Sequence, residues 1–199
     1  MRRIALTGGI ATGKSYVRQQ FEKLGVPTSD ADTRAREAVA SGTEGLAAVV
    51  RAFGPDILEP SGVIDRKKLA GIVFADEAAR RRLEAIVHPA VQRATDAWFA
   101  SLEPARHAFA IADIPLLYEV GRDRDFDEVI VVASEPEVQV RRVMERGLTE
   151  GEARQRLAAQ LPIADKVRRA SYVIRTDGSF EETDRQIATV FERLSRRRV

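Results

Sequence analysis

A glycine-rich segment near the N-terminus constrains this chain more than any other feature. Residues 8–15 read Gly-Gly-Ile-Ala-Thr-Gly-Lys-Ser, which matches the pattern G-x-x-x-x-G-K-[ST]. The apolar run from Arg2 to Thr7 suits a buried strand, and Lys14 to about Leu24 suits a helix that Gly25 ends. A loop of this kind between a strand and a helix predicts an α/β domain that binds the phosphates of ATP or GTP.

The residue types in this loop follow from the charge of phosphate. Phosphate oxygens need several backbone N–H donors close by, and glycine leaves room for that approach. The N-terminus of the following helix adds a favourable dipole. Lys14 is then a point charge for the β- and γ-phosphates, and the Ser15 hydroxyl is a ligand for Mg²⁺. The alternative is a chance glycine turn, which the flanking strand and helix argue against.

Strand and helix signals alternate again in the second half of the chain. Further strands are predicted at Val26 to Asp30, residues 107–114, residues 127–133 and Tyr172 to Arg175. Helix-opening capping boxes are predicted at Ser134 with Glu137, Thr149 with Glu152, and Ser179 with Glu182. This alternation predicts parallel βαβ units.

The segment between residues 31 and 102 differs from the rest because it shows helical spacing and no strand signal. We expect a basic helix from Asp76 to His88, and Pro89 suits the first turn of a separate helix that carries Trp98 and Phe99. The segment is therefore predicted to be a helical insertion within an α/β core.

Composition excludes several other classes of protein. The 32 basic residues nearly match the 30 acidic ones, whereas a dedicated nucleic-acid binder carries a concentrated basic excess. The chain has no cysteine, which excludes disulfides, thiolate metal sites and cysteine nucleophiles. The first apolar stretch ends at Gly8, too early for a signal peptide, and no later run is long enough to span a bilayer. A soluble cytoplasmic protein is expected.

Two acidic residues end predicted strands. Ligands of parallel sheets bind outside the carboxyl ends of the strands, so we expect Asp30 beside the γ-phosphate. There its carboxylate can orient an attacking hydroxyl and accept its proton, or hold Mg²⁺ through water. A helix N-cap explains Asp30 equally well. Asp113 either completes the Mg²⁺ shell through water or is a polar strand terminus.

Arg142 and Arg146 are four residues apart and share a helix face. Mobile arginines neutralise the charge that develops on a transferred phosphoryl group. On the residues alone, a solvated helix surface is the better interpretation. His88 is equally open, because a histidine that ends a helix has a simple structural explanation.

A larger set of motifs resembles the dephospho-CoA kinase family over nearly the whole chain. The matching residues are Ile4 to Ser15, Asp30-Ala31-Asp32, Ala35-Arg36, Phe53-Gly54, Gly62, Arg66, Leu69, Val73-Phe74, His88-Pro89, Pro115-Leu116-Leu117-Tyr118-Glu119, Gln139, Arg142, Arg146, Arg156, Gln160 and Lys166. The resemblance implies a P-loop kinase fold with a five-stranded parallel sheet flanked by helices. It also implies a nucleotide-binding core of residues 1–30 and 104–199, a helical CoA-binding insertion of residues 31–103, and a helical lid at about 137–170.

The resemblance also implies a reaction, in which the ATP γ-phosphoryl group moves to the ribose 3′-hydroxyl of dephospho-CoA in the last step of coenzyme A synthesis. The implied catalytic residues are Lys14, Asp30, Arg142 and Arg146. The implied ATP-binding residues are Gly9, Ile10, Ala11, Thr12, Gly13, Lys14, Ser15, Tyr16 and Arg146. The implied acceptor-binding residues are Asp30, Asp32, Arg36, His88 and Leu116, and Ser15 and Asp113 are the expected Mg²⁺ contacts. No nucleic-acid or membrane partner is expected, and adenine is expected near Arg175 to Gly178.

Two other functions fit parts of the sequence. One is a different small-molecule or nucleoside monophosphate kinase of the same architecture. The other is a nucleotide-dependent switch without turnover, but such switches rely on mobile loops rather than a substrate-sized helical insertion. The guanine-reading motif N-K-x-D is absent, since the chain contains no asparagine, and this disfavours a GTPase.

Overall fold

The structure, a computed structural model, describes residues 1–196, so 197–199 at the end of the predicted core lie outside the described residues. The chain divides into two compact units. A sheet unit comprises Met1–Ser29 and Leu102–Val199, and a helical unit comprises Asp30–Ser101. Each unit is described here by itself.

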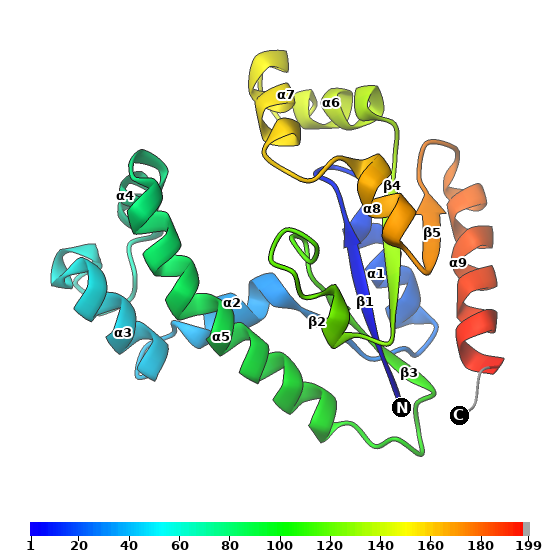
Figure 1. The fold of residues 1–199 in the computed structure, drawn as a ribbon, viewed down its shortest axis with the longest axis horizontal. Helices are drawn as coiled ribbons and strands as arrows, with labels where there is room; N and C mark the ends of the chain where they lie inside the picture. The colour runs from blue at the N-terminus through cyan, green and yellow to red at the C-terminus, as the bar shows by residue number, and fades with distance from the viewer. Residues whose placement is uncertain (197–199) are drawn as a thin grey trace. The chain divides into compact units, whose positions relative to one another are not determined.

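Five strands form one parallel sheet within the described residues (Figure 1). They are β1 (Arg2–Gly8), β2 (Thr28–Asp30), β3 (Phe109–Asp113), β4 (Glu128–Ala133) and β5 (Tyr172–Arg175), in the order β2-β3-β1-β4-β5. The central strand β1 runs parallel to both neighbours, with Ile4 opposite Ile111 on one side and Glu128 on the other. Strands buried on both faces are rich in Val and Ile, and β4 contains the run Val-Ile-Val-Val. The predicted fold class is confirmed.

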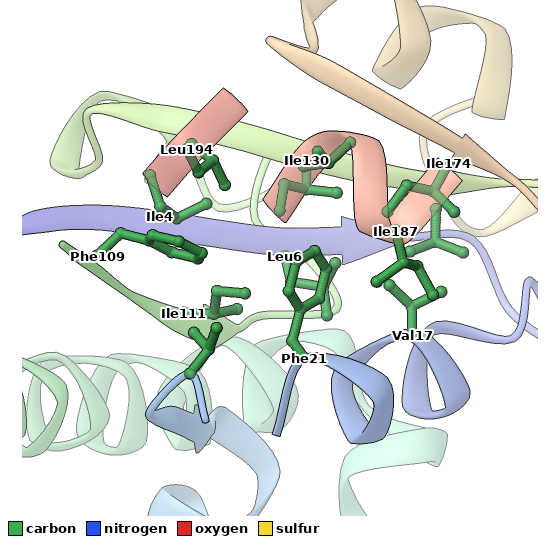
Figure 2. Packing of buried hydrophobic residues seen from close by; sticks show 13 residues of the cluster. Ile4, Leu6, Val17, Phe21, Phe109, Ile111, Ile130, Ile174, Ile187 and Leu194 are labelled. Atoms are coloured by element: carbon green, nitrogen blue, oxygen red, sulfur yellow. The ribbon is translucent and has the colours of Figure 1, made fainter. Parts of the chain in front are cut away.

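One face of the sheet is covered by α1 (Lys14–Lys23) and α9 (Phe180–Arg196). Figure 2 shows the apolar side chains that fill this layer. Ile4 and Leu6 of β1 pack there with Phe21 of α1 and with Ile187 and Leu194 of α9, all of them nearly inaccessible to water. This core fixes the end of β1 and the start of α1, and so it fixes the loop between them.

The chain passes from β3 through η2 (Asp123–Asp125) to β4, and then into α6 (Pro136–Met144), α7 (Glu150–Ala158) and α8 (Ile163–Arg169) (Figure 1). Val140, Val143 and Ala153 of α6 and α7 form a small apolar cluster with Ala11 of the glycine-rich loop. The two helices predicted to belong to a lid are therefore packed on that loop.

Two of the three predicted capping boxes are confirmed, at Thr149 with Glu152 and at Ser179 with Glu182. The box at Ser134 is wrong. Helix α6 begins at Pro136, its N-cap is Glu135, and no side chain caps it. Proline suits the first helical position, and it moves the start of the helix one residue past the point that Ser134 can cap. The Ser134 hydroxyl is buried and has no hydrogen-bond partner among the residues that the structure describes.

The helical unit consists of α2 (Ala31–Ala38), α3 (Glu44–Phe53), η1 (Pro55–Ile57), α4 (Arg66–Ala75) and α5 (Glu77–Ser101). Val49, Ile57, Ile64 and Leu69 form its core. The prediction of two helices that meet at Pro89 is wrong, because α5 continues through Pro89. The proline removes one helical hydrogen bond, and burial of Ala79 before it and Val91 and Phe99 after it compensates for that loss. No helix in the described residues is both long and apolar enough to cross a membrane.

Candidate functional site

The glycine-rich loop between β1 and α1 has the backbone of an anion-binding site. Ala11 has φ 57° and Gly13 has φ 79°, both in the left-handed region. Left-handed residues in such loops turn successive N–H groups toward one side and form a nest for anions. Gly13 is the N-cap of α1, so the positive end of the helix dipole lies at the same place.

Close neighbours explain the two glycines that start the loop. A Cβ on Gly8 would lie 2.6 Å from the carbonyl oxygen of Val132 in β4. A Cβ on Gly9 would lie 2.6 Å from Oε1 of Gln139, a buried residue of α6. The amide of Gln139 is held in this orientation because its Nε2 donates to the Ser134 carbonyl at 2.9 Å. A side chain at Gly8 would displace the backbone of β4, and a side chain at Gly9 would displace the Gln139 amide.

Lys14 and Asp113 form an ion pair at the carboxyl ends of β1 and β3. The Lys14 ammonium donates to Oδ1 of Asp113, whose side chain is only 2% exposed. Arg18, one turn further along α1, places Nε 3.5 Å from Oδ2 of the same carboxylate. Two cations thus hold Asp113 in place, and Lys14 remains 16% exposed at the loop.

Arg142 of α6 connects the loop to the segment after β5. Its guanidinium donates to the carbonyl of Thr176 at 2.6 Å and to the carbonyl of Ala11 at 3.3 Å. The Thr176 hydroxyl donates in turn to the carbonyl of Thr12 at 2.7 Å. A left-handed alanine costs about 1–2 kcal/mol, and these contacts help to hold Ala11 in that conformation.

A cavity of about 620 Å³ opens beside this network. Arg142 and Arg146 both line it, together with Tyr16, Thr176 and Phe180. The rings of Tyr16 and Phe180 are 4.9 Å apart at their centroids. The Tyr16 hydroxyl donates to the Asp184 carboxylate at 2.8 Å, and this hydrogen bond raises the pKa of Tyr16. The cavity next to the anion-binding loop therefore has two aromatic rings and two arginines in its lining, together with Glu145 and Glu181.

A buried lysine supports the other side of the loop. Lys166 of α8 is fully buried, and its Nζ lies 2.7 Å from Oε1 of Glu119 and donates to the Gly8 carbonyl at 3.1 Å. The same Glu119 oxygen accepts the backbone N–H of Leu161 at 3.0 Å. Buried charges are tolerated where they are paired and hydrogen-bonded in this way.

The donor set fits a metal ion carried by a nucleotide rather than a permanently held one. In the part of the chain that the structure describes, no three His, Cys, Asp or Glu side chains come together as a metal site. Mg²⁺ in phosphotransfer sites typically takes one or two protein ligands and completes its shell with phosphate oxygens and water. Ser15, exposed in the first turn of α1, and Asp113 would be oxygen ligands of that number for such an ion.

Comparisons with known proteins identify the family. The sequence model of the dephospho-CoA kinase family matches residues 2–182. The chain belongs to the dephospho-CoA kinase family. Curated dephospho-CoA kinases of Geobacillus kaustophilus and Geobacter sulfurreducens are 46% and 48% identical to it, over 95% and 96% of this chain and 94% and 98% of their own. The predicted family is confirmed, and the chain is a kinase.

Solved structures agree with the membership in the dephospho-CoA kinase family. A Thermus thermophilus protein is 34% identical with a TM-score of 0.83 and covers 97% of both chains. The dephospho-CoA kinase of Campylobacter jejuni is 27% identical with a TM-score of 0.74, over 97% of this chain and 96% of its own. The shikimate kinase of Acinetobacter baumannii is 21% identical with a TM-score of 0.52, over 99% of this chain and 95% of its own, and shows the shared P-loop kinase fold.

The sheet unit contains all the residues predicted to bind ATP, Gly9 to Tyr16 and Arg146. It also contains Arg142, predicted to be catalytic, and Asp113, the expected Mg²⁺ contact. Leu116, predicted to contact the acceptor, follows β3 in the same unit and is 42% exposed.

The other predicted acceptor residues belong to the helical unit. Asp30, the last residue of β2, is the N-cap of α2, and its Oδ1 accepts the backbone N–H of Asp32 at 2.8 Å. Arg36 is exposed on α2 and lines a cavity of about 340 Å³ with Arg66. His88 is exposed on α5.

Reasoning from the residues alone missed the supports of the loop. Gln160, Lys166 and Glu119 matched the family motifs, but no local pattern assigned them a role. Lys166 lies in a charged helix, Ile-Ala-Asp-Lys-Val-Arg-Arg, where nothing marks one cation as buried. Only a tertiary contact separates it from its solvated neighbours.

Proposed function

We propose that this chain transfers the γ-phosphoryl group of ATP to the ribose 3′-hydroxyl of dephospho-CoA, which gives coenzyme A and ADP. The observation that carries this proposal is the anion-binding loop with Lys14 at the start of α1, in a chain that matches the dephospho-CoA kinase family over residues 2–182. Phosphoryl transfer depends on positioning and charge stabilisation rather than on covalent chemistry by the protein. The loop and its cations provide both.

The loop residues Gly9 to Tyr16 are proposed to hold the phosphates of ATP. Lys14 supplies the charge for the β- and γ-phosphates when it moves from Asp113 to the nucleotide. Arg142 and Arg146 are proposed to neutralise charge on the transferred group. Their place in the lining of the 620 Å³ cavity supports this role, and the two aromatic rings are suited to the nucleoside.

Mg²⁺ is the proposed cofactor, with the Ser15 hydroxyl as a direct ligand and Asp113 as a contact through water. When bound, the ion would supply positive charge that stabilises the group being transferred, and Ser15 and Asp113 are the residues that would hold it. Ser15 is exposed at the loop, and Arg18 stays beside the Asp113 carboxylate when Lys14 moves to the nucleotide.

The acceptor side of the reaction is proposed to be organised by Asp30. A carboxylate at the carboxyl end of a parallel strand can align the 3′-hydroxyl and accept its proton. Asp32, Arg36, His88 and Leu116 are proposed acceptor contacts, and residues 31–103 the acceptor-binding insertion. The 340 Å³ cavity of the helical unit has two arginines, Arg36 and Arg66, beside an otherwise largely apolar lining. Such a cavity suits an acceptor that joins phosphates to an apolar arm.

The deciding experiment is an ATP turnover assay with and without dephospho-CoA. We expect ADP to form only when the acceptor is present, and the product to carry its new phosphate on the ribose 3′-position by NMR. Nucleoside monophosphates and shikimate serve as competing acceptors. Preferential turnover of any of these would replace the proposed acceptor, and the absence of ATP turnover with every acceptor would reject the kinase proposal.

Hydrogen exchange tests whether the acceptor binds to the helical unit and ATP to the loop of the sheet unit. Dephospho-CoA should slow amide exchange in the helical unit, Asp30–Ser101, more than in the strands of the sheet unit, because bound ligand suppresses local opening where it binds. The non-hydrolysable ATP analogue AMP-PNP is the matched control and should protect Gly9 to Tyr16 instead. Protection by dephospho-CoA that is confined to the sheet would contradict the assignment of residues 31–103.

We further propose that the enzyme works in the cytoplasm, without a nucleic-acid or membrane partner. Both proposed substrates are water-soluble, and the near balance of 32 basic and 30 acidic residues provides little net attraction to polyanions.

A further inference from the structure

Gln160, in the connection between α7 and α8, contacts the glycine-rich loop through its side chain. Its Oε1 accepts the backbone N–H of Ile10 at 2.8 Å. The orientation of this carboxamide follows from chemistry, because a backbone N–H can only donate and must therefore face the oxygen rather than the nitrogen. The contact fixes both ends of the amide group.

The amide nitrogen consequently points away from the Ile10 N–H. Among the described residues, Nε2 of Gln160 donates no hydrogen bond to the protein, and the residue is only half-buried. The side chain lines a cavity of about 370 Å³ together with Gly9. Two amide hydrogens therefore remain available for a ligand at the edge of the phosphate-binding loop.

Gln139, the other glutamine beside the loop, shows the contrast. Its Oε1 faces Gly9, but its Nε2 donates to the Ser134 carbonyl at 2.9 Å, and the side chain is buried. Both ends of the Gln139 amide therefore face protein atoms, and its role is structural. Gln160 contacts the loop with the oxygen of its amide, and among the described residues its nitrogen donates no hydrogen bond.

The backbone next to Gln160 is also held in place. The N–H of Leu161 donates to Glu119 at 3.0 Å, and Glu119 pairs with the buried Lys166, which donates to the Gly8 carbonyl. Gln160 is thus attached to the loop by its own side chain and by the residue that follows it. A donor held in this way loses little conformational entropy when it binds an anion.

We propose that Nε2 of Gln160 donates a hydrogen bond to a phosphate oxygen of the bound nucleotide, so that one carboxamide joins the Ile10 N–H to the phosphate. This inference rests on the proposed function, because it requires ATP in the loop. A hydrogen bond to a charged oxygen is about twice as strong as one between neutral groups. Gln160 then contributes directly to ATP affinity.

Two substitutions separate this role from a purely structural one. Gln160→Glu keeps the oxygen that accepts the Ile10 N–H but replaces the donor with a negative charge. Gln160→Met has similar length and lacks both the acceptor and the donor. If Nε2 contacts phosphate, ATP affinity should decrease roughly 10-fold in the methionine variant and by about 100-fold in the glutamate variant. If Gln160 only supports the loop, the glutamate variant keeps the acceptor for Ile10 and loses affinity only through long-range repulsion, which high salt should screen. At high salt the methionine variant should then be the weaker of the two.

The measurement is the ATP dissociation constant by calorimetry, together with turnover of ATP and dephospho-CoA and the unfolding temperature. Gln155→Glu makes the same charge change at an exposed position of α7 and should leave ATP affinity unchanged.

Wild-type ATP affinity in Gln160→Glu would overturn the inference while the proposed function stood. A wild-type enzyme that neither bound ATP nor phosphorylated dephospho-CoA would instead reject the proposed function. If the glutamate variant does not fold, the ATP affinity of Gln160→Met is the test. Wild-type ATP affinity in Gln160→Met would overturn the inference.

Discussion

Replacing Lys14 with alanine is expected to lower kcat by about 10²–10³-fold while the protein stays folded. The loss follows from the removal of a positioned cation that stabilises charge developing on the β- and γ-phosphates. The fold should survive because Asp113, the partner of Lys14, also lies 3.5 Å from Nε of Arg18. Steady-state kinetics with ATP and dephospho-CoA measure the effect, and circular dichroism checks the fold.

Lys23→Ala is the matched control for this substitution. Lys23 is exposed at the C-terminal end of the same helix, α1, so its loss removes a positive charge without touching the loop. Its kcat should equal that of the wild type. A folded Lys14→Ala protein with near-normal turnover would contradict the assignment of the phosphate-binding loop.

Replacing Asp30 with asparagine is expected to lower kcat by about 10²–10⁴-fold, the usual range for the loss of a general base. Asparagine cannot take the proton of the ribose hydroxyl. It is nevertheless as good an N-cap as aspartate, so the hydrogen bond from the Asp32 N–H and the stability of α2 should be kept. Affinity for both substrates should change much less than kcat, because a base acts chiefly in the transition state.

Asp65→Asn is the matched control for Asp30→Asn. Asp65 caps α4 in the same unit and accepts the backbone N–H of Lys68 at 2.9 Å, so both substitutions make the same change in a helix cap. A normal kcat in Asp30→Asn would show that Asp30 acts only as the N-cap of α2. Rescue of Asp30→Asn by excess Mg²⁺ would make Asp30 a metal contact, and Asp113 would become the next candidate base.

The strands were predictable because local signals and tertiary structure agree there. The apolar run of residues 127–133 contains the observed β4, Glu128–Ala133, and Tyr172–Arg175 was predicted with its observed bounds. The prediction failed at Pro89, where packing of the 25-residue α5 outweighs the local preference for a helix start. Whether the helix continues through Pro89 depends on packing against residues that are distant in sequence.

Site residues were predictable where binding phosphate requires a particular residue type. Lys14 and Gly13 follow from phosphate charge and backbone conformation, and both can be read from the motif. The contacts of Gln160 with Ile10 and of Lys166 with Gly8 cannot, because each joins segments more than a hundred residues apart. Their roles follow only from the structure, and the catalytic roles of Asp30, Arg142 and Arg146 remain predictions.

The strand order has a consequence for synthesis of the chain on the ribosome. The segment that carries the phosphate-binding loop is made before β3 and β4, yet β1 pairs with both of them, where Arg2 faces Phe109 and Ile4 faces Glu128. Asp30–Ser101 is continuous and can form its own contacts while these partners are still missing. The sheet around the loop therefore cannot be completed until β4 has been made. A chain truncated before Glu128 leaves one edge of the apolar β1 unpaired and open to aggregation.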